Sequence, residues 1–504
     1  MNNRICLISF YNPSSLGLNY LERALRHAGY DVTLIFLKAF NSINPKPASA
    51  EELNHLCSLI KKCDPVAIGF SVMASLYLDV VHQVNKLVKE AFPIPIIWGG
   101  VYASMFPEKA MNYADFVIRG EGEEPLVELL DMLNTVNVEF SQIQNLTYRD
   151  GEIIHTNPLR KLTADLDKYG PPVLGGGNKY VIENGTLTCI DPKINSHSYE
   201  TSCSRGCPFA CSYCCTINLK RIYAGNGQYV RFRSVEKVME ELIIAKQKNR
   251  KLKFIRFWDE IFSNDAVWID AFVELYKKKI NLPFEIWCHP LKCDDAIIAK
   301  LKIAGLYKVV MGIQSGSPYI RKEVFNRPET QDAIIAASKV LAKNKVPQVV
   351  YDFMLRHPFE TKETLKETYE LCKMLALPFE LQLHGLNFLP GTDIVAKAQS
   401  QNLVCADAMK KLMYAPMQKQ FNTYWKNETG NHEMNYIYKL IYLTQFPSYR
   451  KKLDKMADDF NSKDGRAKID KLYKTGTYHA KLRYLHKRGL LVAHSYINRF
   501  IRRD

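Results

Sequence analysis

The sequence lacks several features that would place it in familiar classes of protein. It has no run of about 18 apolar residues, so no segment is predicted to span a membrane. The N-terminus, MNNRICLISF, passes directly into a strand pattern and carries no secretory signal. The 13 cysteines are scattered along 504 residues, whereas disulfide scaffolds are short chains dense in cysteine. These absences predict a cytoplasmic protein with reduced thiols.

Length and charge narrow the possibilities. A chain of 504 residues suffices for roughly three domains. The net charge is +16, and residues 441–504 carry 16 Lys or Arg against 6 Asp or Glu. Such a bias usually marks a solvated basic helical face, although it also suits an anionic substrate, an acidic partner or a membrane surface. We favour packing on a neighbouring domain over membrane association, and no recognisable module predicts a nucleic-acid partner.

The densest group of cysteines lies in residues 200–219, ETSCSRGCPFACSYCCTINL. Cys207, Cys211 and Cys214 have the spacing C-x3-C-x2-C, and Gly206 and Pro208 beside them allow a tight loop with the sulfurs turned inward. Thiolates a few residues apart on such a loop converge on one soft metal centre. Three thiolates on an iron–sulfur cube leave one iron open to a small molecule.

A zinc knuckle is the alternative for this loop. Cys203 or Cys215 would then supply the fourth ligand. Zinc sites more often pair two C-x2-C knuckles, and the sequence contains no second knuckle. We therefore favour the cluster and interpret Cys203 and Cys215 as ordinary buried thiols.

Strand and helix patterns alternate through residues 1–140. The predicted strands are Arg4–Phe10, Asp31–Leu37, Val66–Phe70, Ile94–Trp98 and Phe116–Ile118. This alternation is typical of a doubly wound parallel sheet of the Rossmann type. Ligands bind such sheets beyond the carboxyl ends of the strands, where glycine lets the backbone approach them closely. The candidate binding residues at these ends are Ser71, Gly99, Gly100 and Gly120.

The alternation resumes in residues 195–400, as in a partial β/α barrel, in which chemistry concentrates at the carboxyl ends of the strands. Two polar pairs follow predicted strands there: Asp259 with Glu260, and Gln314 with Ser315. Asp259 could instead cap the next helix. His384, predicted within a later strand, is only a weak candidate for a substrate pocket. Residues 141–194, rich in proline and glycine turns, are predicted as a linker, and residues 401–504 as a basic helical region.

These motifs resemble the radical S-adenosylmethionine (SAM) family. Tyr213 supplies the aromatic residue of its signature C-x3-C-x-aromatic-C. The segments FWDEIF and AGLYKVVMGIQSGSPYIRKEVFNRPET are similar to the strand ends of the family's barrel. The segments WGGVYASMFPEKA and ADFVIRGEGEEPL are similar to the cobalamin-binding domain fused ahead of many radical SAM enzymes. The resemblance covers residues 1–140 and 195–400.

The resemblance implies the roles of individual residues. Cys207, Cys211 and Cys214 would hold a [4Fe-4S] cluster, and Asp259 or Glu260 the SAM ammonium group. Gln314 (where the family usually has Glu), Ser315, and Arg321 or Arg327 would bind the rest of SAM, and the four residues at the N-terminal strand ends would bind cobalamin. Two departures are a missing D-x-H-x-x-G motif and Tyr102 in place of the usual His. The N-terminal domain could therefore be Rossmann-like without binding cobalamin.

The family resemblance also implies an activity. The expected function is a cobalamin-dependent methyltransferase acting on an unactivated carbon, using SAM twice and a reductant such as flavodoxin or ferredoxin. One alternative is a radical enzyme that cyclises, rearranges or oxidises its substrate. A second is a corrinoid or cluster sensor without turnover. The small-molecule or peptide substrate is not identified.

Overall fold

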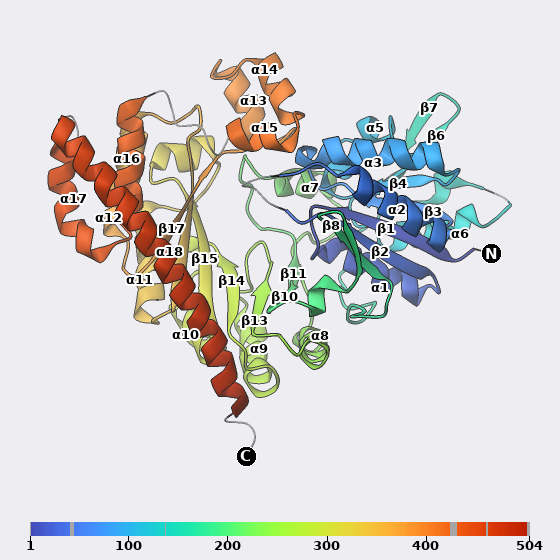
Figure 1. The fold of residues 1–504 in the computed structure, drawn as a ribbon, viewed down its shortest axis with the longest axis horizontal. Helices are drawn as coiled ribbons and strands as arrows, with labels where there is room; N and C mark the ends of the chain where they lie inside the picture. Colours follow the sequence, from blue (N-terminus) through green and yellow to red (C-terminus); the bar gives the residue numbers. More distant parts are fainter. Residues whose placement is uncertain (1, 41–44, 137, 424–430, 460–461, 501–504) are drawn as a thin grey trace.

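The structure, a computed structural model, describes residues 2–40, 45–136, 138–423, 431–459 and 462–500. Two sheets lie next to each other, and the C-terminal helices reach across both (Figure 1). The predicted fold class is confirmed: a Rossmann-like domain, a partial β/α barrel and a mostly helical C-terminal region. None of the described helices combines the length and apolarity needed to cross a bilayer.

The first sheet has nine strands in the order β7-β6-β5-β4-β3-β1-β2-β8-β9, and the six from β5 to β8 are parallel. Its central strands are buried apolar runs because helices cover both faces. The strands are β1 (Arg4–Phe10), β2 (Asp31–Leu37), β3 (Ala67–Ser71), β4 (Ile96–Gly99) and β5 (Phe116–Ile118). The helices are α1 (Leu16–His27), α2 (Ala50–Cys63), α3 (Leu78–Ala91), α4 (Val101–Met105), α5 (Pro107–Ala110) and α6 (Glu123–Leu133).

The segment predicted as a linker, residues 141–194, supplies four strands to this sheet and is therefore more ordered than expected. These strands are β6 (Leu146–Asp150), β7 (Ile153–Thr156), β8 (Lys179–Glu183) and β9 (Thr186–Cys189). They are short and form two hairpins, so turn residues dominate the local pattern. Asn184 and Gly185 both have positive φ, as a two-residue hairpin turn requires.

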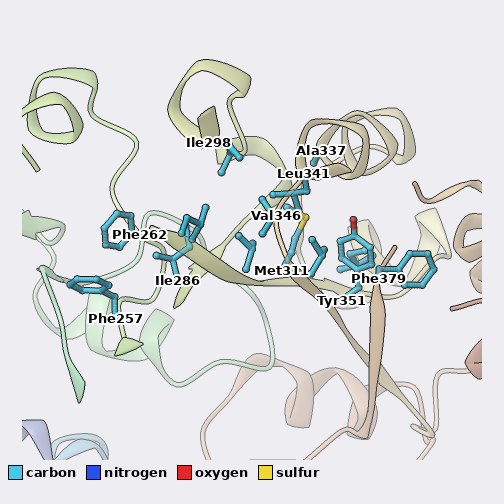
Figure 2. Packing of buried hydrophobic residues seen from close by; sticks show 14 of the residues in the cluster. Phe257, Phe262, Ile286, Ile298, Met311, Ala337, Leu341, Val346, Tyr351 and Phe379 are labelled. Atoms are coloured by element: carbon cyan, nitrogen blue, oxygen red, sulfur yellow. The ribbon is translucent and has the colours of Figure 1, made fainter. Parts of the chain in front are cut away.

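The second sheet is a partial barrel of six parallel strands in the order β10-β13-β14-β15-β16-β17. The strands are β10 (Ser198–Thr201), β13 (Phe254–Phe257), β14 (Phe284–Cys288), β15 (Leu306–Gln314), β16 (Gln348–Leu355) and β17 (Glu380–Gly385). The helices are α8 (Val235–Lys248), α9 (Ala266–Lys279), α10 (Asp295–Ala304), α11 (Gln331–Lys343) and α12 (Lys362–Met374). Figure 2 shows strand residues such as Phe257, Ile286 and Met311 packed towards the helices.

The C-terminal region packs on both sheets. Its helices are α13 (Asp393–Ser400), α14 (Ala406–Met413), α15 (Met417–Phe421), α16 (His432–Leu443), α17 (Pro447–Asp459) and α18 (Lys463–Phe500). Met417 and Phe421 are buried in the core of the first sheet, whereas Ile441 is buried in the core of the barrel. The segments next to the cysteines are β11 (Ser204–Arg205), β12 (Arg231–Phe232) and α7 (Thr216–Ile222).

One buried carboxyl group joins α16 to the barrel. Glu360 accepts hydrogen bonds from Tyr438 Oη (2.6 Å) and the N–H of Arg356 (2.7 Å). Burial raises the pKa of Glu360 to about 7. His357 Nε2 lies 3.8 Å from Glu360 Oε1, but His357 is neutral near pH 7 because burial lowers its pKa to about 3.

We expect Glu360→Gln to stabilise the protein above pH 7. The raised pKa means that the folded state binds a proton between about pH 4.5 and 7 that the unfolded state releases, so wild-type stability falls as pH rises through this window. At about 1.4 kcal/mol per pKa unit, the gain at pH 8 is up to about 3 kcal/mol and vanishes by pH 4.5. Thermal unfolding from pH 5 to 8 measures it, with exposed Glu370→Gln as the control. A gain that does not depend on pH would contradict the prediction.

Candidate active site

The cysteine loop is fixed to the barrel at both ends. At its start, Asp259 accepts hydrogen bonds from the N–H of Cys203 (2.9 Å) and the hydroxyl of Ser204. At its end, the Ser212 hydroxyl donates to the carbonyl of Val324 (2.6 Å). The candidate ligands therefore lie on a loop whose path is set by buried hydrogen bonds.

A glycine directly before the first candidate ligand is required by this path. Gly206 has φ +89°, and a Cβ placed on it would lie 2.3 Å from the carbonyl oxygen of Tyr229. Any side chain would move the loop or the neighbouring strand.

The three candidate thiols interact electrostatically. Burial raises the pKa of Cys207 to about 12 and also raises that of Cys214, and the nearby Cys211 and Glu260 act in the same direction on both. Burial therefore disfavours the thiolate forms of Cys207 and Cys214. The positive charge of bound iron would offset that cost.

The zinc alternative receives no support from the geometry. Among the residues that the structure describes, no three His, Cys, Asp or Glu side chains converge on one metal-ion position. A closed zinc site needs four ligands around a single ion, whereas each thiolate on an iron–sulfur cube binds a different iron. Cys203 is fully buried beside Asp259, and Cys215 is half-buried, so the interpretation of both as ordinary thiols stays a prediction.

The two acids after β13 occupy different environments. Asp259 is buried, and burial raises its pKa to about 7, while it holds the start of the cysteine loop. It does not cap a helix. The Glu260 side chain reaches solvent, but the surrounding protein still raises its pKa, while a hydrogen bond with Thr216 acts in the opposite direction. Its charge contributes to raising the pKa of Cys207 and Cys214. Glu260 is therefore the carboxylate available to a cation beside the cysteines.

Most predicted SAM-binding groups at the end of β15 already have protein partners. Ser315 is buried, and its carbonyl and hydroxyl accept hydrogen bonds from Arg321 Nη1 (2.8 Å) and the N–H of Ser317 (3.1 Å). Gln314, at φ +69°, lies where the register of β15 shifts and is half-buried. Of this group, Gln314 is the residue whose side chain remains a candidate for a ligand contact.

Arg327 connects the cysteine loop to β15. Its guanidinium donates to Tyr213 Oη (3.0 Å) and the carbonyl of Gly312 (2.7 Å), and it pairs with Glu329. Its Nη1 lies 3.9 Å from Cys211 Sγ. Although Arg327 and Tyr213 lie at the cysteines as predicted, their polar groups bind each other, so both are positioned to orient the loop.

The predicted cobalamin-binding residues share one cavity. A space of about 270 Å³ at the carboxyl ends of β1, β3, β4 and β5 is lined by Ser71, Gly99, Gly100 and Gly120. Its walls are mainly apolar: Leu7, Leu18, Leu21, Ile97, Ile118 and Leu126. A Cβ on Gly100 would lie 2.8 Å from the carbonyl oxygen of Val72, and one on Gly120 would lie 1.8 Å from Tyr223 Oη. Both glycines also have positive φ, so the cavity depends on them.

The cavity fits part of a corrinoid. Its volume is just below the roughly 300–1,000 Å³ of small-molecule sites, and its apolar walls suit a flat aromatic arm. The macrocycle itself is too large for this space and would have to lie at its open mouth.

Arginines link this cavity to the cysteine loop. Arg205, two residues before Cys207, lines the cavity and pairs with Glu123 and Glu121 of the β5–α6 loop. Arg231 pairs with Glu121 at 2.5 Å. We call Arg205, Arg231, Glu121 and Glu123 the arginine clamp. Sequence reasoning missed it, because ion pairs between residues about a hundred positions apart leave no local pattern.

Comparisons with known proteins agree with this geometry. Residues 201–372 match the model of the radical SAM superfamily, and residues 9–130 match that of the B12 binding domain. The chain is 27% identical over 398 residues to an uncharacterized methyltransferase of Pyrococcus horikoshii, covering 77% of this chain and 79% of that protein. It is 26% identical over 368 residues to the anaerobic magnesium-protoporphyrin IX monomethyl ester cyclase of Cereibacter sphaeroides, covering 70% of this chain and 55% of the cyclase.

A solved structure supports the fold. The radical SAM methyltransferase TsrM from Kitasatospora setae, solved with cobalamin and a [4Fe-4S] cluster, matches with a TM-score of 0.61 at 14% identity, covering 80% of this chain and 78% of that one. The cysteine loop falls within the radical SAM match, and the apolar cavity is lined mainly by residues of the B12 match, with Arg205 from the radical SAM match. The chain therefore carries a B12 binding domain ahead of a radical SAM domain, and the cofactors of these two domains are cobalamin, a [4Fe-4S] cluster and SAM.

Proposed function

We propose that this enzyme is a cobalamin-dependent methyltransferase that acts on an unactivated carbon. The observation that carries the proposal is the shared boundary of the two sites: Arg205 lines the corrinoid cavity and lies two residues before Cys207. Relatives named as methyltransferases support it. When bound, the cluster and SAM supply one-electron chemistry, and cobalamin supplies methyl transfer.

The proposal gives each group of residues a task. Cys207, Cys211 and Cys214 hold the cluster and leave one position open, and the carboxylate of Glu260 binds the SAM ammonium group. Gln314 offers a neutral hydrogen-bonding group to SAM. The glycines of the cavity let backbone approach the corrinoid, while its apolar walls exclude water. Enzymes of this superfamily need a reductant and a substrate, and we propose a cytoplasmic flavodoxin or ferredoxin as the reductant.

Anaerobic reconstitution with iron, sulfide and hydroxocobalamin, followed by SAM and dithionite, tests the function. We expect visible spectra of a cubane and a corrinoid, and formation of 5′-deoxyadenosine. In the presence of substrate, S-adenosylhomocysteine should form as well. Formation of 5′-deoxyadenosine without S-adenosylhomocysteine during substrate turnover would favour cyclisation or oxidation. The cyclase among the relatives is the reason to test for this outcome. A sensor would cleave no SAM under any condition tried.

Glu260→Gln is expected to raise the KM for SAM by about tenfold while kcat changes less, because the ammonium group loses a charge-assisted hydrogen bond. The rate of 5′-deoxyadenosine formation against SAM concentration measures both constants. Glu236→Gln, on helix α8, is the control for removing a negative charge elsewhere. An unchanged KM would assign the ammonium group to another acceptor.

A further inference from the structure

The inner face of the partial barrel carries its side chains in rows. Alternate residues of each strand point to the same face, and parallel pairing aligns them across the sheet. The row nearest the amino ends contains Glu200, Arg256, Glu285 and Lys308. The next row contains Trp258, Trp287, Val310 and Val350. A third row, closer to the carboxyl ends, contains Gly312, Asp352 and Gln382.

The charged side chains of the first row form ion pairs with one another. Arg256 lies 3.6 Å from Glu200 and 3.3 Å from Glu285, and Lys308 lies 3.2 Å from Glu285. These ion pairs close the bottom of the barrel, so the second row is the deepest uncharged layer that a ligand entering from the carboxyl edge could reach.

The second row is an aromatic platform made by Trp258 and Trp287. The two indole rings stack with centroids 4.4 Å apart and planes 25° apart. Their neighbours Phe257 and Ile286 point into the core on the opposite face of the sheet. Trp258 nevertheless stays 44% exposed, although barrel interiors are normally filled by packed apolar side chains. Protein atoms therefore leave much of the Trp258 indole uncovered on the inner face.

The third row carries a hydrogen-bond acceptor on β16, two strands away from Trp287 on β14. Asp352 lies about 7 Å closer to the carboxyl edge than the tryptophan row, two residues along the strands. Its Oδ1 is buried and has no hydrogen-bond partner, with His384 Nε2 at 3.6 Å. Gln382 beside it in the row is exposed, whereas the amide of Gln314 fills the space over Gly312. The row thus presents, next to an exposed side chain, an acceptor that lacks a hydrogen-bond donor.

We propose that the Trp258–Trp287 platform and Asp352 form the substrate site, and that the substrate carries a flat unsaturated group with a hydrogen-bond donor. This inference rests on the proposed function, which places the reacting SAM at the same carboxyl edge. A flat π-system gains stacking energy on an indole face, while the donor satisfies Asp352 Oδ1. A saturated chain would gain from neither feature.

Binding of model amines to the anaerobically reconstituted enzyme with SAM tests the platform. The probes are benzylamine and its saturated counterpart cyclohexylmethylamine, measured by saturation-transfer NMR titration. We expect the aromatic amine to bind at least about tenfold more tightly. Trp258→Ala should lower the affinity for the aromatic amine at least about fivefold. Trp258→Phe should retain most of the affinity, because stacking survives on a smaller ring. Asp352→Asn should weaken it as well.

Tyr319→Ala, which removes an exposed aromatic side chain elsewhere, is the control for nonspecific adsorption. Equal affinity for the two amines, or unchanged affinity in Trp258→Ala, overturns the platform. 5′-Deoxyadenosine formation is measured in the same preparations. Loss of amine binding with SAM cleavage retained supports the substrate site, whereas selective amine binding without any SAM cleavage supports the platform and overturns the proposed function.

Discussion

Cys211→Ala is expected to reduce 5′-deoxyadenosine formation more than about a hundredfold and to remove the cubane absorption of the reconstituted protein. Losing a direct ligand should exceed the roughly 10–100-fold cost of losing a group that only supports a ligand. Cys211 Sγ also lies 3.9 Å from Arg327 Nη1, so the substitution removes this contact of the cysteine loop as well. Iron content, visible absorption and SAM cleavage measure the loss together.

Cys215→Ala is the matched control, because this neighbouring thiol is half-buried on the same segment. Under the cluster assignment it should retain iron, absorption and SAM cleavage. Equal loss of zinc in Cys215→Ala and Cys211→Ala would mean that four cysteines bind one zinc ion. That result would contradict the cluster assignment and the radical mechanism.

Arg205→Gln is expected to weaken corrinoid binding about 10–100-fold while SAM cleavage stays within about threefold of wild type. The change leaves Glu123, whose side chain is 13% exposed, without its guanidinium, and hydrogen bonds to charged groups contribute roughly 1.5–3 kcal/mol. The β5–α6 loop carries Gly120, so its movement alters the cavity wall directly. Visible titration with hydroxocobalamin gives the corrinoid affinity, and 5′-deoxyadenosine reports the cluster site.

Arg205→Lys should recover only part of the corrinoid affinity, because an ammonium group cannot reach two carboxylates with the geometry of a guanidinium. Arg221→Gln, an exposed arginine on α7 paired with Asp393, is the control. If Arg205→Gln leaves the corrinoid affinity unchanged, the arginine clamp does not influence the cavity.

Periodicity and strand ends were enough to predict the architecture. The first strand is buried at six of its seven positions, as a parallel strand covered on both faces requires, and its sequence is apolar after Arg4 except at Ser9. The candidate glycines were predictable for a similar reason, because ligand sites of such sheets lie at the carboxyl ends of the strands. The four strands in residues 146–189 were missed because hairpin turns interrupt them every few residues.

Roles within the site were harder to predict than its location. Asp259 and Glu260 are adjacent in sequence, yet only burial distinguishes the acid that anchors the loop from the acid that faces the cysteines. Ser315 and Arg327 match the expected positions, but contacts with other protein groups occupy them. Arg205 and Glu123 are 82 residues apart, a separation at which no sequence period reports pairing.

The C-terminal helices tie the two cofactor domains together. Helix α15 places Met417 and Phe421 in the core of the first sheet, while α16 places Ile441 in the core of the barrel, and α13–α15 lie between the two at the top of Figure 1. This brace packs on the face of the first sheet that carries Ile8 and Trp98, whereas the cavity walls Leu7 and Ile97 lie on the opposite face. Helix α15 contributes no lining residue to the cavity, so it fixes the two domains to each other while leaving the corrinoid side of the sheet uncovered by its own side chains.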